Sequence, residues 1–157
     1  MKPNEEWTVL PHGELTKLAP NLYTVVGKLR MPLGETPRRM TVVKLSGGGL
    51  VIYSAIALNE VEMRKLEALG APAYLVVPSA IHRLDARAWK TRYPAIKVVA
   101  PEGAHAKVSD VVPVDANGVD FGDERVRLTT VPGTAAREFA MVAVSYTHLT
   151  LPTILRV

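Results

Sequence analysis

The sequence predicts an α/β fold in which helices cover a sheet. Three features indicate it: an opening pair of strands joined by a glycine turn, a central alternation of strand, helix, strand, helix and strand, and a closing group of strand-like segments. The chain has 157 residues, of which 48% are hydrophobic and 22% charged, so it can bury a core. No repeat or low-complexity linker interrupts it, and we expect one domain, or part of a larger one, over residues 1–143.

The first strands are expected at residues 22–26 and 40–45, which are rich in the Val, Thr and Tyr that suit a pleated surface. Ser46 and three glycines then lead into the apolar run 50–53. This pattern predicts a hairpin and not a phosphate-binding loop, because the Lys and the Ser or Thr that follow the last glycine of a P-loop are absent.

Residues 59–69 form the clearest expected helix. Asn59 and Glu62 have the spacing of a capping box, in which the first side chain bonds the backbone of the helix start. Val61 is expected near the buried face together with two leucines, and Gly70 can end the helix in a left-handed conformation.

Two short continuous apolar runs, residues 73–77 and 96–100, have the pattern of strands buried on both faces. Residues 84–92 between them predict a second helix that ends before Pro94. Later segments with the composition of meandering strands are 111–114, 119–121, 126–131 and 138–143.

Composition excludes several classes of protein. The net charge of +4 is spread along the chain without a basic block, so we expect no nucleic-acid partner. The absence of cysteine removes disulfides, thiolate metal sites and a Cys nucleophile, and it fits a reducing compartment. The start is polar and acidic, unlike a secretory signal, and no apolar stretch reaches the roughly 18 residues of a membrane span. We therefore expect a cytoplasmic protein with no membrane partner.

The ending breaks abruptly from the pattern of the domain. Residues 144–157 resemble the in-frame translation of a sequencing-library adapter, a string that recurs at the ends of chains predicted from metagenomic assemblies. We expect this tail to be non-native and exclude Tyr146 and His148 from every site, as for an engineered scar. The alternative is a genuine Thr-rich terminal strand.

The most informative segment is residues 78–85, which follows the apolar run 73–77. Loops at the carboxyl ends of strands carry the chemistry of many α/β proteins, so His82 and Asp85 are the candidate metal or binding residues. Their i, i+3 spacing could place both on one side of a helical turn. Three interpretations stay open: a weak metal site, a pair bonded to each other or to nearby backbone, and polar contacts of a metal-free pocket.

Further candidates for a pocket are Ser79, Trp89 and Thr134. Trp89 and Tyr93 lie four residues apart and could form an aromatic wall, although packing of both against the sheet is the simpler expectation. We expect neither Ser54 nor Ser79 to have a nearby His or a sharp nucleophile turn, which argues against a serine hydrolase.

The order of these motifs resembles the metallo-β-lactamase superfamily, in a divergent branch, over about residues 18–143. The segments that carry the resemblance are a first strand at 18–25, a hairpin at 40–53, the loop segment 78–94, a hairpin at 115–123 and a Pro-Gly turn at 130–134. The resemblance implies a metallo-β-lactamase-like αβ/βα sandwich, truncated here to about its first half plus the following strands.

Members of this superfamily bind metal through a His-x-His-x-Asp-His loop and a His in the Pro-Gly turn. When this sequence is aligned with that loop, the four ligand positions are occupied by Ala80, His82, Leu84 and Asp85. His82 alone has the residue type of the superfamily's ligand at its position. Thr134 stands at the His of the Pro-Gly turn. The strand that often ends in an Asp in this superfamily ends here in Tyr53, Ser54 and Ala55.

Catalytic zinc needs about three protein ligands and an open position for water. The resemblance therefore implies a protein of this fold with a degenerate metal loop, an unknown small-molecule ligand and no functional dinuclear metal site. We expect no cofactor, with zinc or iron as the alternatives. The rival hypothesis is a metal-dependent hydrolase or oxidoreductase with a rearranged site on His82 and Asp85, completed by residues missing from this chain. A truncated sandwich would also expose an apolar sheet face and self-associate.

Overall fold

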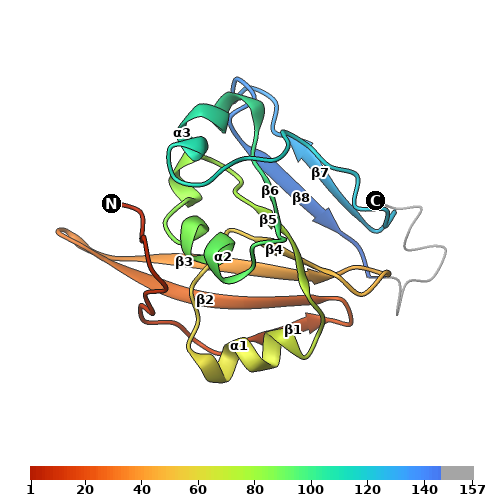
Figure 1. The fold of residues 1–157 in the computed structure, drawn as a ribbon, viewed down its shortest axis with the longest axis horizontal. Helices are drawn as coiled ribbons and strands as arrows, with labels where there is room; N and C mark the ends of the chain where they lie inside the picture. The colour runs from red at the N-terminus through yellow and green to blue at the C-terminus, as the bar shows by residue number, and fades with distance from the viewer. Residues whose placement is uncertain (146–157) are drawn as a thin grey trace.

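The computed structural model describes residues 1–145 and contains a mixed six-stranded sheet with a smaller two-stranded sheet beside it (Figure 1). The strands are β1 (Thr16–Ala19), β2 (Leu22–Met31), β3 (Gly34–Lys44), β4 (Leu50–Tyr53), β5 (Pro72–Val76), β6 (Lys97–Val99), β7 (Val126–Thr130) and β8 (Phe139–Ala143). The helices are α1 (Glu60–Glu67), α2 (Ala86–Arg92) and α3 (His105–Ser109), with 3₁₀ turns at Ala80–His82 and Glu102–Ala104. Of the expected tail, residues 146–157, including Tyr146 and His148, lie outside the described residues.

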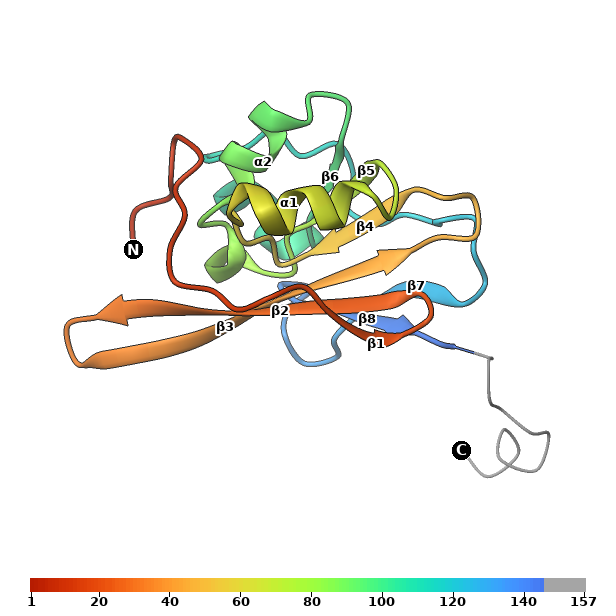
Figure 2. The ribbon, with the colours of Figure 1, turned by 90° about the horizontal axis from the view of Figure 1, so that it is seen from below.

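The large sheet changes direction in its middle. Its strand order follows the chain from β1 to β6, with antiparallel pairing up to β4 and parallel pairing from β4 through β6. Helices α1 and α2 connect the parallel strands and lie on one face, while β7 and β8 lie on the other (Figure 2). The predicted α/β architecture is confirmed, and the carboxyl ends of β4 and β5 meet at one edge.

Two apolar layers hold these parts together. Val42 and Val43 are both 0% exposed although they face opposite sides of β3, because one joins the core under the helices and the other the core under β7 and β8. The same holds for Val51 and Ile52 of β4. Burial on both faces explains the continuous apolar runs of the central strands.

Helix α1 begins as the sequence predicts. Asn59 caps it by accepting from the backbone N–H of Glu62 at 3.0 Å. The reciprocal half of the capping box does not form, because the Glu62 carboxylate accepts from the backbone N–H of Leu15 instead, at 2.8 Å. The expectation that Val61 lies on the buried face is wrong: its side chain is 59% exposed, and the buried stripe runs through Met63.

The predicted strands at residues 111–114 and 119–121 are wrong, since both segments are irregular. Their apolar residues are buried without strand pairing: Val112 joins the core under the helices, and Phe121 packs edge-on against Tyr74 with 5.0 Å between ring centroids. Between these segments, Asp115 and Ala116 form backbone hydrogen bonds with Val98 and Ala100 at the edge of the sheet. These two segments are therefore apolar because their side chains are buried, and not because they form strands.

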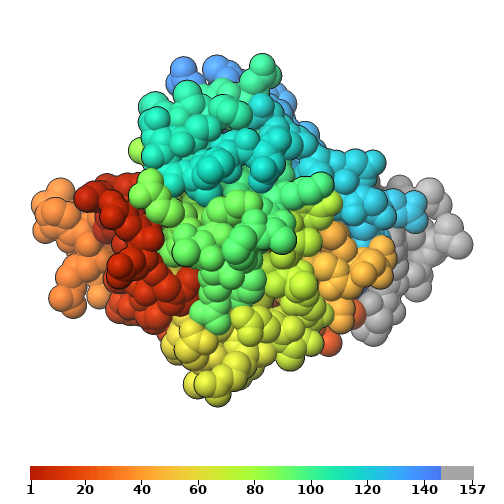
Figure 3. Space-filling model, viewed as in Figure 1, coloured from red at the N-terminus to blue at the C-terminus, as the bar shows by residue number. Residues whose placement is uncertain are grey.

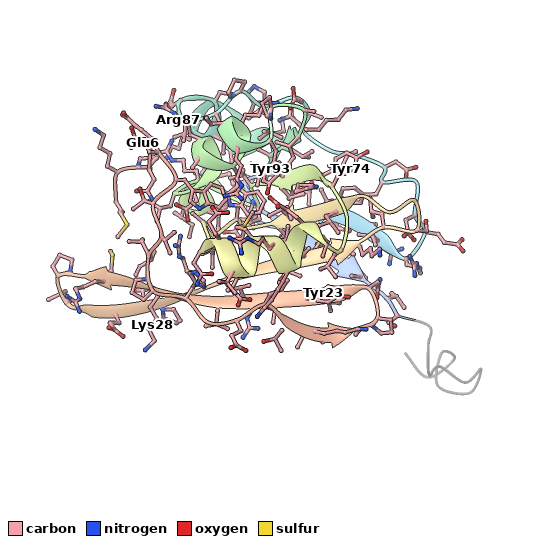
Figure 4. All side chains as sticks on the ribbon, turned by 60° about the horizontal axis from the view of Figure 1, so that its bottom comes forward. Glu6, Tyr23, Lys28, Tyr74, Arg87 and Tyr93 are labelled. Atoms are coloured by element: carbon pink, nitrogen blue, oxygen red, sulfur yellow. The ribbon has the colours of Figure 1, made fainter. Side chains whose placement is uncertain are left out.

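The N-terminal segment crosses the surface between the β2–β3 hairpin and the helices (Figure 3). Glu5 forms an ion pair with Arg87 of α2 at 3.9 Å, and Figure 4 labels Arg87 and the neighbouring N-terminal residue Glu6. The backbone N–H of Asn4 donates to the carbonyl of Leu84 at 2.8 Å. Within the described part of the chain, no helix has the length and apolar character needed to cross a membrane.

Candidate functional site

A cleft of about 470 Å³ lies at the edge of the sheet where β4 and β5 end. It is bordered by β3, by the loop that follows β5 and by the start of β8. The residues that line it are Pro37, Arg38, Arg39, Thr41, Tyr53, Ser54, Pro78, Ser79, Ile81, His82, Glu138 and Phe139. The carboxyl ends of parallel strands are the usual position of ligand sites in open α/β sheets, so this cleft is the candidate site.

Asp85 is completely buried behind the cleft and uses both carboxylate oxygens within the protein. Oδ2 accepts from Arg38 Nη1 at 2.7 Å and from the backbone N–H of Ala57 at 3.1 Å, and Oδ1 accepts from Asn4 Nδ2 at 2.7 Å. These partners come from the N-terminal segment, from β3 and from the loop before α1. Asp85 therefore ties together three segments that are distant in sequence.

Arg38 is the link between this buried carboxylate and the cleft. Its Nη1 holds Asp85, while its Nε and Nη2 are buried and have no hydrogen-bond partner within residues 1–145. Arg39, the next residue, projects from the other face of β3, donates from Nη1 to Thr24 Oγ1 at 3.1 Å, and forms no ion pair with any described residue. The cleft is therefore bordered by two guanidinium groups.

Ser54 and His82 meet within the cleft. The Ser54 hydroxyl lies 2.8 Å from His82 Nδ1. Ser54 follows β4 with φ at 57°, in the left-handed region that residues other than glycine seldom adopt, and its backbone N–H donates to the carbonyl of Val76 at 3.0 Å. His82 ends the 3₁₀ turn Ala80–His82.

Burial favours the neutral form of the His82 ring. Partial burial lowers the pKa of His82 below its usual value of 6.5, and the nearby Glu138 carboxylate acts in the opposite direction with a smaller effect. Burial also raises the pKa of Tyr53, whose hydroxyl donates to the carbonyl of Phe139 at 2.8 Å. The side chains of charged type that line the cleft are Arg38, Arg39 and Glu138, and the buried Asp85 behind the cleft offsets the charge of Arg38.

The prediction that Ser54 has no nearby His is wrong. The two residues are 28 positions apart, and folding brings them together because β4 and β5 are parallel neighbours whose carboxyl ends share one edge. Ser54 follows the apolar run 50–53, which was expected as a hairpin strand, and His82 follows the run 73–77, which was expected to be buried on both faces. The structure pairs these two runs in parallel, which places their carboxyl ends at one site.

The other predicted site residues are distributed differently. Ser79 lines the cleft as expected. Trp89 does not: it is 0% exposed, donates from Nε1 to the carbonyl of Ile56 at 3.1 Å, and packs in the core, so its assignment to a pocket is wrong. Thr134 is absent from the cleft lining and donates to the carbonyl of Val131 at 2.7 Å, which closes the turn.

His82 and Asp85 do not converge on a common point. Asp85 is engaged by Arg38 and His82 by Ser54, and the residues described contain no group of three or more His, Cys, Asp or Glu side chains that could hold a metal ion. In the cleft itself, the side chains of ligand type are His82 and Glu138. Zinc needs about three ligands, so this donor set does not fit a catalytic zinc site.

Comparison with solved structures identifies the fold. The chain superposes on the DIM-1 metallo-β-lactamase (TM-score 0.63, 13% identity, 87% of this chain and 67% of that one). It also matches metallo-β-lactamases from Erythrobacter litoralis (TM-score 0.62, 15% identity, 82% and 65%) and Hirschia baltica (TM-score 0.59, 13% identity, 83% and 66%). The chain spans about two thirds of the length of each.

These likenesses define the class: the chain has the metallo-β-lactamase fold. At identities of 12–15% they establish the fold alone. No protein-family model matches the sequence, and no curated protein matches it. Membership of a divergent branch stays a prediction.

Proposed function

We propose that this protein binds a small anionic molecule in the cleft without a metal ion. The ion pair between Arg38 and Asp85 is the observation that carries the proposal. The resemblance aligns Asp85 with a metal ligand, but in this chain its carboxylate holds a guanidinium at the cleft. Asp85, aligned with a metal ligand of the superfamily, therefore holds the side chain of Arg38, a hydrogen-bond donor of the type that binds anions.

The unused donors of Arg38 support this proposal. Nε and Nη2 lie along one edge of the guanidinium, the edge that carboxylates and phosphates engage with two parallel hydrogen bonds. Buried polar groups are nearly always satisfied, and an unpaired one costs about 1–3 kcal/mol. Both N–H groups are closed to solvent in this structure, so an anion that pairs with them must displace the atoms that cover this edge, whereas Arg39 is exposed at the cleft.

The size and lining of the cleft suit a small ligand. Its volume of about 470 Å³ lies within the range of about 300–1,000 Å³ that is usual for small-molecule sites. Arg39 adds a positive charge at the rim, and Pro37, Ile81 and Phe139 add apolar surface. We therefore expect a ligand with a carboxylate or phosphate group joined to a short apolar part. We also propose a cytoplasmic location, with which the absence of cysteine is consistent.

The second candidate is a metal-dependent hydrolase or oxidoreductase with a rearranged site. Its support is that His82 and Glu138 line the same cleft, and that the named metallo-β-lactamases extend beyond the two thirds of their length that this chain spans. Further ligands from such an extension could complete a site with these two side chains. The two candidates differ in what a chelator does to ligand binding.

Calorimetric titration of the full chain with inorganic phosphate and with succinate, before and after chelation of metals, tests the proposal. We expect saturable binding that chelation leaves unchanged and that Arg39→Gln weakens about tenfold, since a charge-assisted hydrogen bond contributes about 1.5–3 kcal/mol. Arg30→Gln, an exposed arginine outside the cleft, removes the same charge and should bind normally. Absence of binding, or binding that chelation abolishes, would contradict the proposal.

A further inference from the structure

We propose that Ser54 and His82 form a nucleophile and base pair that accepts an acyl group from a small carboxylic ester in the cleft. Both side chains line the cleft, and 2.8 Å separates the hydroxyl oxygen from Nδ1. This separation is within the range needed for proton transfer between a serine and its general base. The activity goes beyond binding and needs no metal ion.

The backbone of Ser54 has the character expected of a nucleophile turn. A residue other than glycine at φ 57° is strained, and such strain concentrates at functional sites. In hydrolases of the nucleophile-elbow type, the serine likewise occupies a strained turn directly after a strand. Here two features stabilise the strained conformation of Ser54: the hydrogen bond from its N–H to the carbonyl of Val76, and the burial of the next two residues, Ala55 and Ile56.

Other strained positions of the described chain lie elsewhere. Ala135 and Ala136 also have positive φ, at 53° and 56°, but neither lines the cleft. Their conformation has a packing explanation, because the Gly103 N–H donates to the carbonyl of Ala136 at 2.8 Å. Ser54 combines backbone strain, a place in the cleft and an imidazole partner.

One ring nitrogen of His82 has a hydrogen-bond partner and the other has none among the residues described. The backbone N–H of His82 donates to the carbonyl of Ser79 at 3.1 Å, which fixes the 3₁₀ turn, and Nδ1 faces Ser54. Within residues 1–145, Nε2 has no hydrogen-bond partner, and Glu138 lines the cleft near the ring. In the tautomer that serves this role, Nδ1 accepts the hydroxyl proton and Nε2 carries its own.

The reaction balances with water as the second reactant. Ser54 Oγ forms a bond to the ester carbonyl carbon while its proton moves to His82 Nδ1. The carbon–oxygen bond to the leaving alkoxide then breaks, and the alkoxide takes the proton from Nδ1, which leaves acyl-Ser54 and an alcohol. Water repeats the sequence, releases the carboxylic acid and returns the proton to Ser54. A preference for esters that carry an anionic group rests on the proposed function, because it depends on Arg39.

A neutral alkyl fluorophosphonate tests the pair directly, with chelator present. Attack by Ser54 Oγ forms an oxygen–phosphorus bond and expels fluoride, so intact-mass and peptide spectra should show one adduct on Ser54. Ser79→Ala should keep the adduct, because Ser79 lines the same cleft without an imidazole partner among the residues described. Arg30→Gln, outside the cleft, should also keep it. Because the probe carries no anionic group, failure of anion binding and failure of this proposal can be told apart.

His82→Gln separates a base from a structural contact, because glutamine can hold the Ser54 hydroxyl but cannot take its proton. We expect the labelling rate of this variant to fall at least about 100-fold, the lower limit of what a positioned general base contributes. Circular dichroism and thermal melts establish that each variant is folded. A folded wild-type protein with no adduct on Ser54, or His82→Gln labelled at the wild-type rate, would overturn the proposal.

Discussion

Arg38 and Asp85 form a buried ion pair, with 2.7 Å between Nη1 and Oδ2, that joins β3 to the loop before α2. The Asp85 side chain is 0% exposed and that of Arg38 is 12% exposed. Removing one partner of such a pair leaves an uncompensated charge in the interior. The pair is therefore both a structural link and the reason why Asp85 is unavailable in the cleft.

Asp85→Ala should destabilise the protein by about 3–5 kcal/mol, the usual cost of breaking a buried pair from one side. Urea unfolding monitored by circular dichroism measures the change. Lys28→Gln is the control, because Lys28 and Glu35 form an exposed pair at 3.4 Å, for which a change below about 1 kcal/mol is expected. An Asp85→Ala protein as stable as the control would contradict the assigned role.

The strain at Ser54 predicts an unusual ranking of substitutions. Both Ser54→Ala and Ser54→Gly lose the contact with His82, but only glycine adopts φ 57° without steric cost. Ser54→Gly should therefore be more stable than Ser54→Ala by about 1 kcal/mol, within the range for left-handed residues other than glycine. The comparison needs one unfolding curve for each variant. Equal stabilities, or alanine as the more stable, would show that the turn is unstrained.

Asp123 predicts an acid-sensitive contribution to stability. Its carboxylate accepts from the Arg125 side chain and from the backbone N–H groups of Ser46 and Arg125, which hold the pKa of Asp123 well below its usual value of 3.8. Because the folded-state pKa is depressed, the stabilisation is full above about pH 4 and is lost as the pH falls further.

Unfolding of Asp123→Asn at pH 7 and at pH 3 tests this sign. At pH 7 the variant should be less stable than the wild type by about 1–3 kcal/mol, the cost of losing hydrogen bonds to a charged, buried group. The difference should shrink at pH 3, because the unfolded wild-type chain takes up a proton at Asp123 there while the folded chain still holds the charge. A difference that stays constant or grows in acid would mean that Asp123 is not the group involved.

Self-association through exposed apolar side chains of the strands is a further prediction. Val26 and Val142 are 41% and 39% exposed, and exposed apolar surface promotes contacts between copies. Light scattering should show a mass that rises with concentration, and Val142→Lys should reduce the rise. A monodisperse monomer at high concentration would contradict this expectation.

Local signals predicted the fold well where one residue type determines the conformation. Asn59 caps α1, and the apolar runs before Ser54 and before Pro78 are the buried parallel strands β4 and β5. The same signals failed where burial occurs without pairing, as at Val112 and Phe121, which lie in irregular segments. Apolar composition reports burial, and strand formation also requires a free neighbouring edge.

The candidate site was predicted only in part. The loop after β5 and His82 were identified, because a polar segment after a buried strand is a general signal. The partners of these residues were not, since Asp85 is 47 residues from Arg38 and His82 is 28 residues from Ser54. Trp89 was misplaced because the orientation of α2 against the sheet, which sequence spacing does not define, turns the indole into the core.

Metal content of the purified full chain is the most direct test of a metal-independent cleft. The protein is incubated with zinc or iron, dialysed and measured by inductively coupled plasma mass spectrometry beside His82→Ala. We expect no stoichiometric metal in either protein, because Asp85 is held by Arg38 and two ligand-type side chains line the cleft. One tightly held zinc or iron ion per chain that disappears in His82→Ala would contradict the central claim.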